Sequence, residues 1–250
     1  MAKQEKKAQK ITRPSILLYA SEVVRAMGER YDLRQFHQNF EAEKLGDGHP
    51  ILVIPGFMAS GKSTLPLRQF LQQVGYSVYD WGLGRNLGHL SSLDILLAKI
   101  KELHTKYQSK VTLIGWSLGG VFARHLVHQN PSLVRQIITL GSPFSGLTQP
   151  NNASWLYDLM NRKAPIKSLN KEWLETLPLP VPIPSTAIYS KRDGVVPWQA
   201  CMELIEDETT ENIEIKGSHI GLGVNPVVFK IIYDRLQYGQ ADWCKWKIEE

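Results

Sequence analysis

The chain has 250 residues, of which 43 % are hydrophobic and 21 % are charged, and its formal net charge is +5. This composition excludes a chain that is disordered throughout, and the length allows one large domain whose core needs no disulfide or metal. The two cysteines, Cys201 and Cys244, exclude a disulfide framework and lack the spacing of metal ligands, so we expect free thiols in a cytoplasmic protein.

The first ten residues carry much of the positive charge, on Lys3, Lys6, Lys7 and Lys10. Such a tail can contact nucleic acid or anionic lipid, but a basic terminus is more often solvated. We therefore expect no nucleic-acid partner and, at most, a weak contact of this tail with a membrane surface. No stretch approaches the ~20 apolar residues of a membrane span, and the apolar run at 16–20 is shorter than the ~7–15 residues of a secretory signal core.

A helix is predicted over residues 15–27, because four apolar residues recur there at helical spacing: Ile16, Ala20, Val23 and Met27. Ser15 can cap its first turn, and Gly28 can end it. We expect its apolar face to pack on the rest of the protein. Residues 1–48 are assigned to a basic tail and helical extension that precede the main domain.

From residue 50 onward, short apolar runs alternate with amphipathic stretches. In chain order, the pattern predicts a strand at 51–54, a helix at 64–74, a strand at 76–79, a helix at 93–103, a strand at 111–114, a helix at 118–128 and a strand at 136–140. Strands at 186–189 and 213–215 follow, with a helix near 199–205 between them and a last helix at 225–236. This alternation indicates one α/β domain over residues 49–250, with a parallel sheet covered on both faces.

The stretch at about 147–184 is irregular and is predicted to be a lid inserted in this domain, because a long loop in a compact domain is usually a lid or a binding element. Alternate prolines over residues 177–184 exclude a helix or a central strand and indicate an extended connector. Four apolar side chains of the lid either line a binding site for an apolar group or pack on the domain: Trp155, Leu156, Leu159 and Met160.

The segment Gly115-Trp116-Ser117-Leu118-Gly119 has the pattern G-x-S-x-G, between a predicted strand and a predicted helix. A sharp strand-to-helix turn forces the serine into a strained backbone conformation and exposes its Oγ at the edge of the sheet, while the glycines make room for the turn. The segment therefore predicts that Ser117 is a nucleophile. The alternative interpretation is a tight structural turn.

A serine hydroxyl is a weak nucleophile at neutral pH, so it needs a base, and the base needs an orienting partner. After a G-x-S-x-G turn these partners follow in the order acid, then histidine. Asp193 follows the predicted strand that ends at residue 189, and His219 follows the one that ends at residue 215. We predict Asp193 as the acid and His219 as the base, with Asp80 as the reserve candidate for the acid.

The oxyanion that develops during acyl transfer needs hydrogen-bond donors that are in place before the reaction. One is the backbone N–H of the residue after the nucleophile, Leu118. The other is expected from the loop after the first core strand, where we choose the N–H of Phe57. This chemistry needs no metal and no organic cofactor.

These passages together resemble the α/β-hydrolase superfamily, in particular its bacterial lipase and esterase-like members, over residues 49 to 238. Residues 54–57, 115–120 and 139–143 carry the likeness, with the Asp193 and His219 loops. The resemblance implies the α/β-hydrolase fold, with a mostly parallel central sheet, helices on both faces and a small lid. It also implies a serine hydrolase whose substrate is a small-molecule carboxylic ester or thioester, although fold and mechanism transfer between relatives better than substrate does. Pro55, Trp116 and Phe144 stand where many lipases have histidine, which weakens the case for a true triacylglycerol lipase.

Three other functions stay open from the residues alone. The same triad supports acyl transfer to an acceptor other than water, so a hydrolase and an acyltransferase are not separated. Residues 56–63 match the phosphate-binding pattern G-x-x-x-x-G-K-[ST], but Pro66 lies early in the following helix, and an acid for Mg²⁺ would have to come from the short strand that ends near Asp80. The third function is a non-catalytic binding module on a hydrolase fold.

Overall fold

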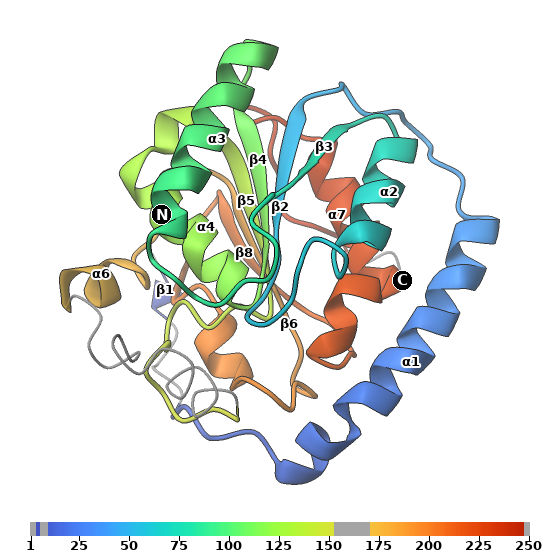
Figure 1. Ribbon diagram of the computed structural model, residues 1–250, viewed down its shortest axis with the longest axis vertical. Coiled ribbons are helices and arrows are strands. Elements are labelled where there is room, and N and C mark those ends of the chain that lie inside the picture. The colour runs from blue at the N-terminus through green and yellow to red at the C-terminus, as the bar shows by residue number, and fades with distance from the viewer. Residues whose placement is uncertain (1–3, 6–9, 153–170, 248–250) are drawn as a thin grey trace.

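The computed structural model describes residues 4–5, 10–152 and 171–247 (Figure 1). Six strands form its central sheet: β2 (Pro50–Ile54), β3 (Ser77–Asp80), β4 (Val111–Trp116), β5 (Val134–Leu140), β6 (Ser185–Tyr189) and β8 (Thr210–Glu214). They are all parallel, in the order β3-β2-β4-β5-β6-β8. Every residue of β2, β4 and β6 is buried, which explains why their sequences are continuous apolar runs.

Helices cover both faces of this sheet, as predicted. Their bounds are α2 (Leu65–Gln73), α3 (Ser92–Tyr107), α4 (Leu118–Gln129) and α7 (Pro226–Leu236). Figure 1 shows α3 and α4 on one face and α2 and α7 on the other, and each pair contributes to its own cluster of buried apolar side chains. Within the described ranges, no helix combines the length and the apolar character that a membrane span requires.

The helix predicted near 199–205 is wrong. The chain there forms a 3-10 turn, Trp198–Cys201, and then a two-residue strand, β7 (Ile205–Glu206), that pairs with β1 (Gln4–Glu5). The N–H of Glu203 donates to the side chain of Asn212 at 2.7 Å instead of to a carbonyl of the preceding turn. A helix therefore cannot continue through Glu203.

The first helix, α1 (Ile16–Asn39), is longer than predicted. The side chain of Ser15 caps it as expected and accepts a hydrogen bond from the Leu17 N–H at 3.3 Å. Gly28, which was predicted to end the helix, lies inside it, and the helix continues to Asn39. A single glycine weakens a helix by only about 1 kcal/mol, so the tertiary contacts of the residues on either side decide where the helix ends.

The predicted orientation of α1 is also wrong. Ile16, Val23 and Met27 were expected to pack on the domain, but they are exposed, and the buried face of the helix carries Glu22, Ala26 and Leu33 instead. Helical spacing shows which residues share one face of the helix. It does not show which face packs against the rest of the protein.

Part of the predicted lid lies within the described residues. α6 (Lys171–Thr176) is followed by the extended connector expected from its prolines, along which Leu177, Val181 and Ile183 are buried. The four apolar side chains at 155, 156, 159 and 160 lie outside the described residues. The domain boundary at 48/49 and the limits of the lid stay predictions.

The order of the strands marks one place at the carboxyl edge of the sheet. The chain passes from β2 outward to β3 and then returns to the other side of β2 to form β4. In open α/β sheets, ligands bind beyond the carboxyl ends of the strands at such a reversal. The loop after β2 and Ser117 after β4 meet there.

Candidate active site

Ser117 occupies a strained turn between β4 and α4. Its backbone has φ of 54° and ψ of −124°, in a region that non-glycine residues rarely adopt. The turn requires small neighbours: a Cβ on Gly119 would collide with the carbonyl oxygen of Ile54. The turn thus has the strained backbone that G-x-S-x-G predicted.

The structure brings the three predicted triad residues together. Ser117 Oγ lies 3.0 Å from Nε2 of His219, and Nδ1 of His219 lies 2.5 Å from Oδ2 of Asp193. Asp193 comes from the loop after β6, and His219 precedes the 3-10 turn Ile220–Val224 after β8. Parallel strands end at the same edge of the sheet, so these loops converge although their residues are far apart in sequence.

The loop of Asp193 fixes the direction of its carboxylate. Oδ1 accepts hydrogen bonds from the N–H groups of Val195 and Val196, both at 2.8 Å, which leaves Oδ2 to accept from His219. The side chain is buried, so these bonds replace those that water would make. Asp193 is therefore held by the backbone N–H groups of Val195 and Val196 as well as by the imidazole.

The pKa of His219 is raised above its usual value of 6.5. Burial alone would lower it, because burial disfavours the charged imidazolium. The negative charge of Asp193, its hydrogen bond to Nδ1 and the negative charge of Glu22 act in the opposite direction and together outweigh burial. The site thus stabilises a positive charge on His219.

The two predicted oxyanion donors belong to segments that adjoin Ser117. Leu118 is the first residue of α4, where backbone N–H groups have no acceptor within the helix. Phe57 follows Gly56, and a Cβ on Gly56 would lie 3.0 Å from the Cβ of Ser117. The loop after β2 therefore lies directly against Ser117.

Sequence reasoning missed Asn86, which braces this loop. The residue is fully buried, and its side-chain amide donates to the carbonyl of Pro55 at 2.8 Å. Its backbone accepts from the N–H of Met58 and donates to the carbonyl of Ala59, both at 2.7 Å. Asn86 lies in a glycine-rich stretch without a recognisable motif, so no signal in the sequence indicated this role.

Trp116 also contributes more than the sequence indicated. Its indole Nε1 donates to the backbone carbonyl of His219 at 3.1 Å, and the indole lies beside the imidazole with ring centroids 6.4 Å apart. The residue that stands where many lipases have histidine thus supports the histidine loop. Its position directly before Ser117 was the signal available.

Two other candidate residues have contacts of their own elsewhere in the fold. Asp80 lies against Gly61, where an added Cβ would collide with its carboxylate, and the carboxylate bonded to His219 Nδ1 is that of Asp193. His49 bonds to Asp47 and to Thr112 near the start of β2. The reserve acid is therefore not the partner of His219.

Residues 56–63 do not have the form of a phosphate-binding loop. In such loops the helix begins at the lysine, whereas α2 begins only at Leu65, and Ser63 closes a turn by donating from both its N–H and its Oγ to the carbonyl of Ser60. Lys62 is exposed. The loop is instead part of the surroundings of Ser117.

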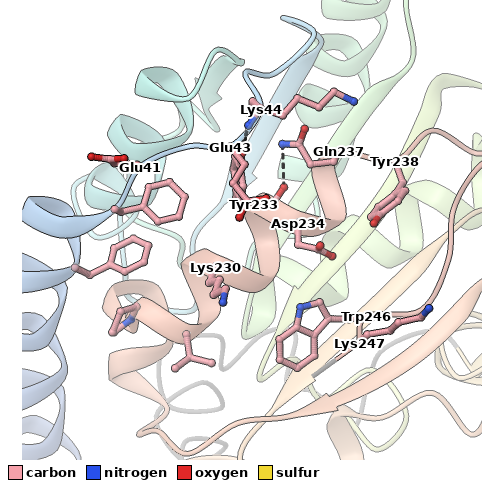
Figure 2. Close-up of a pocket in the computed structure, with 14 residues that line it drawn as sticks. Glu41, Glu43, Lys44, Lys230, Tyr233, Asp234, Gln237, Tyr238, Trp246 and Lys247 are labelled. Atoms are coloured by element: carbon pink, nitrogen blue, oxygen red, sulfur yellow. Dashed lines mark hydrogen bonds between the residues drawn. The ribbon is translucent and has the colours of Figure 1, made fainter. Parts of the chain in front are cut away.

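The described residues contain no cluster of three or more His, Cys, Asp or Glu side chains that could hold a metal ion. A cavity of about 520 Å³ lies between the end of α1, α7 and residues 246–247 (Figure 2), and none of Ser117, Asp193 or His219 lines it. The candidate active site and this cavity are therefore in different parts of the molecule.

Comparisons with known proteins agree with this architecture. A family model described as the alpha/beta hydrolase fold matches residues 49–170, whereas no curated protein matches the chain. Among solved structures, a metagenome-derived lipolytic enzyme has 18% identity and a TM-score of 0.61, with 78% of this chain and 95% of that chain covered. Lipase B of Aspergillus fumigatus has 18% identity and a TM-score of 0.62, with coverages of 79% and 55%.

The mature form of a Bacillus licheniformis lipase has 18% identity and a TM-score of 0.57, with 79% of this chain and 96% of that chain covered. Likeness at this identity establishes the fold. The parallel sheet, the strained serine turn between β4 and α4 and the family match all agree, and the chain has the α/β-hydrolase fold.

Proposed function

We propose that the protein is a serine hydrolase that cleaves a small carboxylic ester or thioester through an acyl-enzyme on Ser117. One observation carries this proposal: a continuous series of contacts runs from Ser117 Oγ through both nitrogens of His219 to Asp193. The fold and its lipase and esterase neighbours support the same class of reaction.

In the proposed reaction, Ser117 Oγ attacks the carbonyl carbon while Nε2 of His219 takes the hydroxyl proton. The tetrahedral oxyanion accepts hydrogen bonds from the N–H groups of Phe57 and Leu118. His219 then gives its proton to the leaving oxygen or sulfur, that bond breaks, and the acyl-enzyme remains. Water attacks the acyl-enzyme with His219 again as the base, which releases the acid and restores Ser117. Asp193 keeps the imidazole in the tautomer with a proton on Nδ1.

The acyl group is proposed to be apolar. Two considerations support this: the neighbours are described as lipases and lipolytic enzymes, and the inserted segment carries four apolar side chains at 155, 156, 159 and 160. Activity across a series of acyl chain lengths tests this choice. A preference for acetate over all longer chains would contradict it.

The experiment measures turnover of p-nitrophenyl esters from acetate to palmitate by the wild type and by Ser117→Ala, with labelling by a fluorophosphonate probe in parallel. We expect turnover and labelling in the wild type, and neither in Ser117→Ala. Lys62→Ala, which removes an exposed side chain of the phosphate-loop pattern, is the control and is expected to keep wild-type turnover. Equal labelling of the wild type and Ser117→Ala would contradict the assignment of the nucleophile.

Two further outcomes separate the alternatives. If added alcohol receives the acyl group faster than water does, the same triad serves an acyltransferase. If folded wild-type protein neither turns over esters nor reacts with the probe, the protein is a binding module and not a hydrolase.

A further inference from the structure

The inner face of α1 contributes a buried carboxylate to the two loops that carry Asp193 and His219. The side chain of Glu22 is 2 % exposed. One of its oxygens accepts a hydrogen bond from the N–H of Gly194 at 2.8 Å, and the other accepts from the N–H of Ile220 at 2.9 Å. Each donor directly follows a triad residue, so one carboxylate joins the acid loop to the histidine loop.

Two further side chains of α1 strengthen this connection. Arg25 donates to Oε1 of Glu22 at 2.8 Å and to the carbonyl of Arg192 in the acid loop, also at 2.8 Å. Glu29 accepts a hydrogen bond from the N–H of Ser218 at 2.7 Å. The helix therefore contacts the backbone directly before and after each member of the acid–base pair.

We infer that Glu22 is a positioning residue for the His219–Asp193 pair, and that α1 is a working part of the active site and not only an extension of the domain. This inference rests on the proposed function. The carboxylate fixes the distance between the two loops, and its negative charge lies close to the imidazole. Among the described residues, two charged groups act on His219: Asp193 from the loop after β6 and Glu22 from α1. Arg25 is bonded to Glu22.

The first test reads the pKa of His219 directly, by an NMR titration of the imidazole signals in the full chain, with His219→Asn to assign them. Glu22→Gln keeps the size of the side chain and removes its charge, and Asp32→Asn removes an exposed charge from the same helix as the control. We expect the pKa of His219 to fall in Glu22→Gln, because a negative charge that stabilises the imidazolium is lost. It stays unchanged in Asp32→Asn, and an unchanged value in Glu22→Gln overturns the inference.

Turnover gives the second readout. We expect kcat/KM to fall about 10–100-fold in Glu22→Gln, as for loss of a hydrogen bond to a charged group, and the acid limb of its pH profile to move to lower pH. A lower rate with an unmoved acid limb would make Glu22 merely structural and would overturn the inference. Glu22→Asp keeps the charge but is too short to reach both donors. If Glu22→Gln does not fold, the turnover of Glu22→Asp is the test. Turnover equal to that of the wild type in Glu22→Asp overturns the inference.

The two proposals fail separately. If wild-type protein turns over no ester but the pKa of His219 still falls in Glu22→Gln, the proposed function is wrong and the contact between Glu22 and His219 stands. If esters are hydrolysed and that pKa does not move, the proposed function stands and the role of Glu22 is wrong.

The outer face of α1 carries an independent feature. Figure 1 shows this helix along the outside of the molecule. Six large apolar side chains on it are 54–78% exposed: Ile16, Leu17, Val23, Val24, Met27 and Tyr31. Their spacing places them together along one side of the helix, which we call the outer stripe. A contiguous exposed apolar surface of this kind marks an interaction site.

The charges around the outer stripe indicate its partner. Four exposed basic residues lie on α1 or just before it: Lys10, Arg13, Arg30 and Arg34. Asp32 is the one exposed acidic residue of 10–39, and the tail that precedes them adds Lys3, Lys6 and Lys7 in the sequence. A second copy of this chain would bring like charges together. We propose that the outer stripe docks on an anionic bilayer surface, where apolar side chains enter the head-group boundary and the cations contact lipid phosphates.

Co-sedimentation with vesicles tests this proposal, with phosphatidylcholine alone and with added phosphatidylglycerol. We expect binding that increases with the anionic lipid and falls at least about tenfold when Val24 and Met27 are both replaced by serine. Ile95→Ser, at an exposed isoleucine of α3, is the matched control and is expected to bind as the wild type does. The proposal is overturned if the double variant binds as well as the wild type, if neither binds, or if the stripe instead mediates a dimer that the double variant dissociates.

Discussion

Replacement of Arg124 tests how the extended connector after α6 is attached to α4, the helix that follows Ser117. Arg124 lies on α4, is fully buried, and donates to both carboxylate oxygens of Glu203, at 2.6 and 2.7 Å. It also donates to the carbonyls of Leu177 at 2.5 Å and Leu179 at 2.7 Å, and its guanidinium lies 4.0 Å from the centre of the Phe144 ring. One side chain thus joins the helix, the connector and the loop after β5.

The expected loss of stability in Arg124→Met follows from the buried groups that lose their partner. Methionine keeps the length of the side chain but removes the charge and every donor, so Glu203 stays buried with only neutral partners such as Ser185 Oγ. Removal of one partner of a buried ion pair costs about 3–5 kcal/mol of the free energy of unfolding. For a chain of this size each kcal/mol lowers Tm by about 2–4 °C, so we expect Tm to fall by about 6–20 °C.

Thermal unfolding followed by circular dichroism measures this change. The control is Arg68→Met on α2, where the arginine is only partly buried and donates to Thr64 Oγ1 and the Gly61 carbonyl, and where we expect a loss of less than about 4 °C. Combination of Arg124→Met with Glu203→Gln should lower Tm by less than the sum of the single changes, because the two side chains interact. A loss in Arg124→Met no larger than that of the control would refute the reasoning.

Three further predictions concern the site and its surroundings. Asn86→Ala is expected to lower kcat about 10–100-fold, because the loop after β2 loses its brace at Pro55; unchanged initial rates with p-nitrophenyl butyrate would count against this. Trp116→Phe removes the bond to the His219 carbonyl and is expected to lower kcat/KM about 2–10-fold, which steady-state kinetics checks; full activity would show that the bond has no role. Burial, with the charges of nearby groups, lowers the pKa of His128 from 6.5 to about 4, so the unfolded chain binds this proton at a higher pH than the native state does. The free energy of unfolding in urea should therefore decrease as pH falls from 6.5 to 4, and His128→Gln should flatten that decrease; an equal slope in both proteins would contradict it.

The parts of the molecule that could be predicted from the sequence are those with a local pattern. The strands β2, β4 and β6 are buried on both faces, and such strands have to be continuous apolar runs. The turn at Ser117 needs small neighbours on both sides, which the glycines at 115 and 119 display directly. Asp193 and His219 could be chosen because each follows a strand and the two come in the expected order.

The parts that could not be predicted depend on backbone groups that are distant in the chain. Glu22 accepts from the N–H groups of Gly194 and Ile220, and Asn86 donates to the carbonyl of Pro55. Nearly every residue offers the same backbone donor and acceptor, so a contact with a backbone group does not require a particular residue type at that position. The sequence therefore does not reveal which backbone group a distant side chain binds. For the same reason the inward face of α1 could not be chosen from the spacing of its apolar residues.

The contacts of Glu22 also have a consequence for the order in which the site is completed during synthesis. They join residues that are 172 and 198 positions apart in the chain. A ribosome makes α1 early, but the backbone groups that its carboxylate binds do not exist until residues 194 and 220 have been added. A nascent chain that has already formed β2, β4 and the serine turn therefore holds Ser117 without the organised pair of His219 and Asp193 beside it. The contacts of Glu22 can therefore form only after residue 220 has been made, so the proposed site cannot be complete before that point of synthesis.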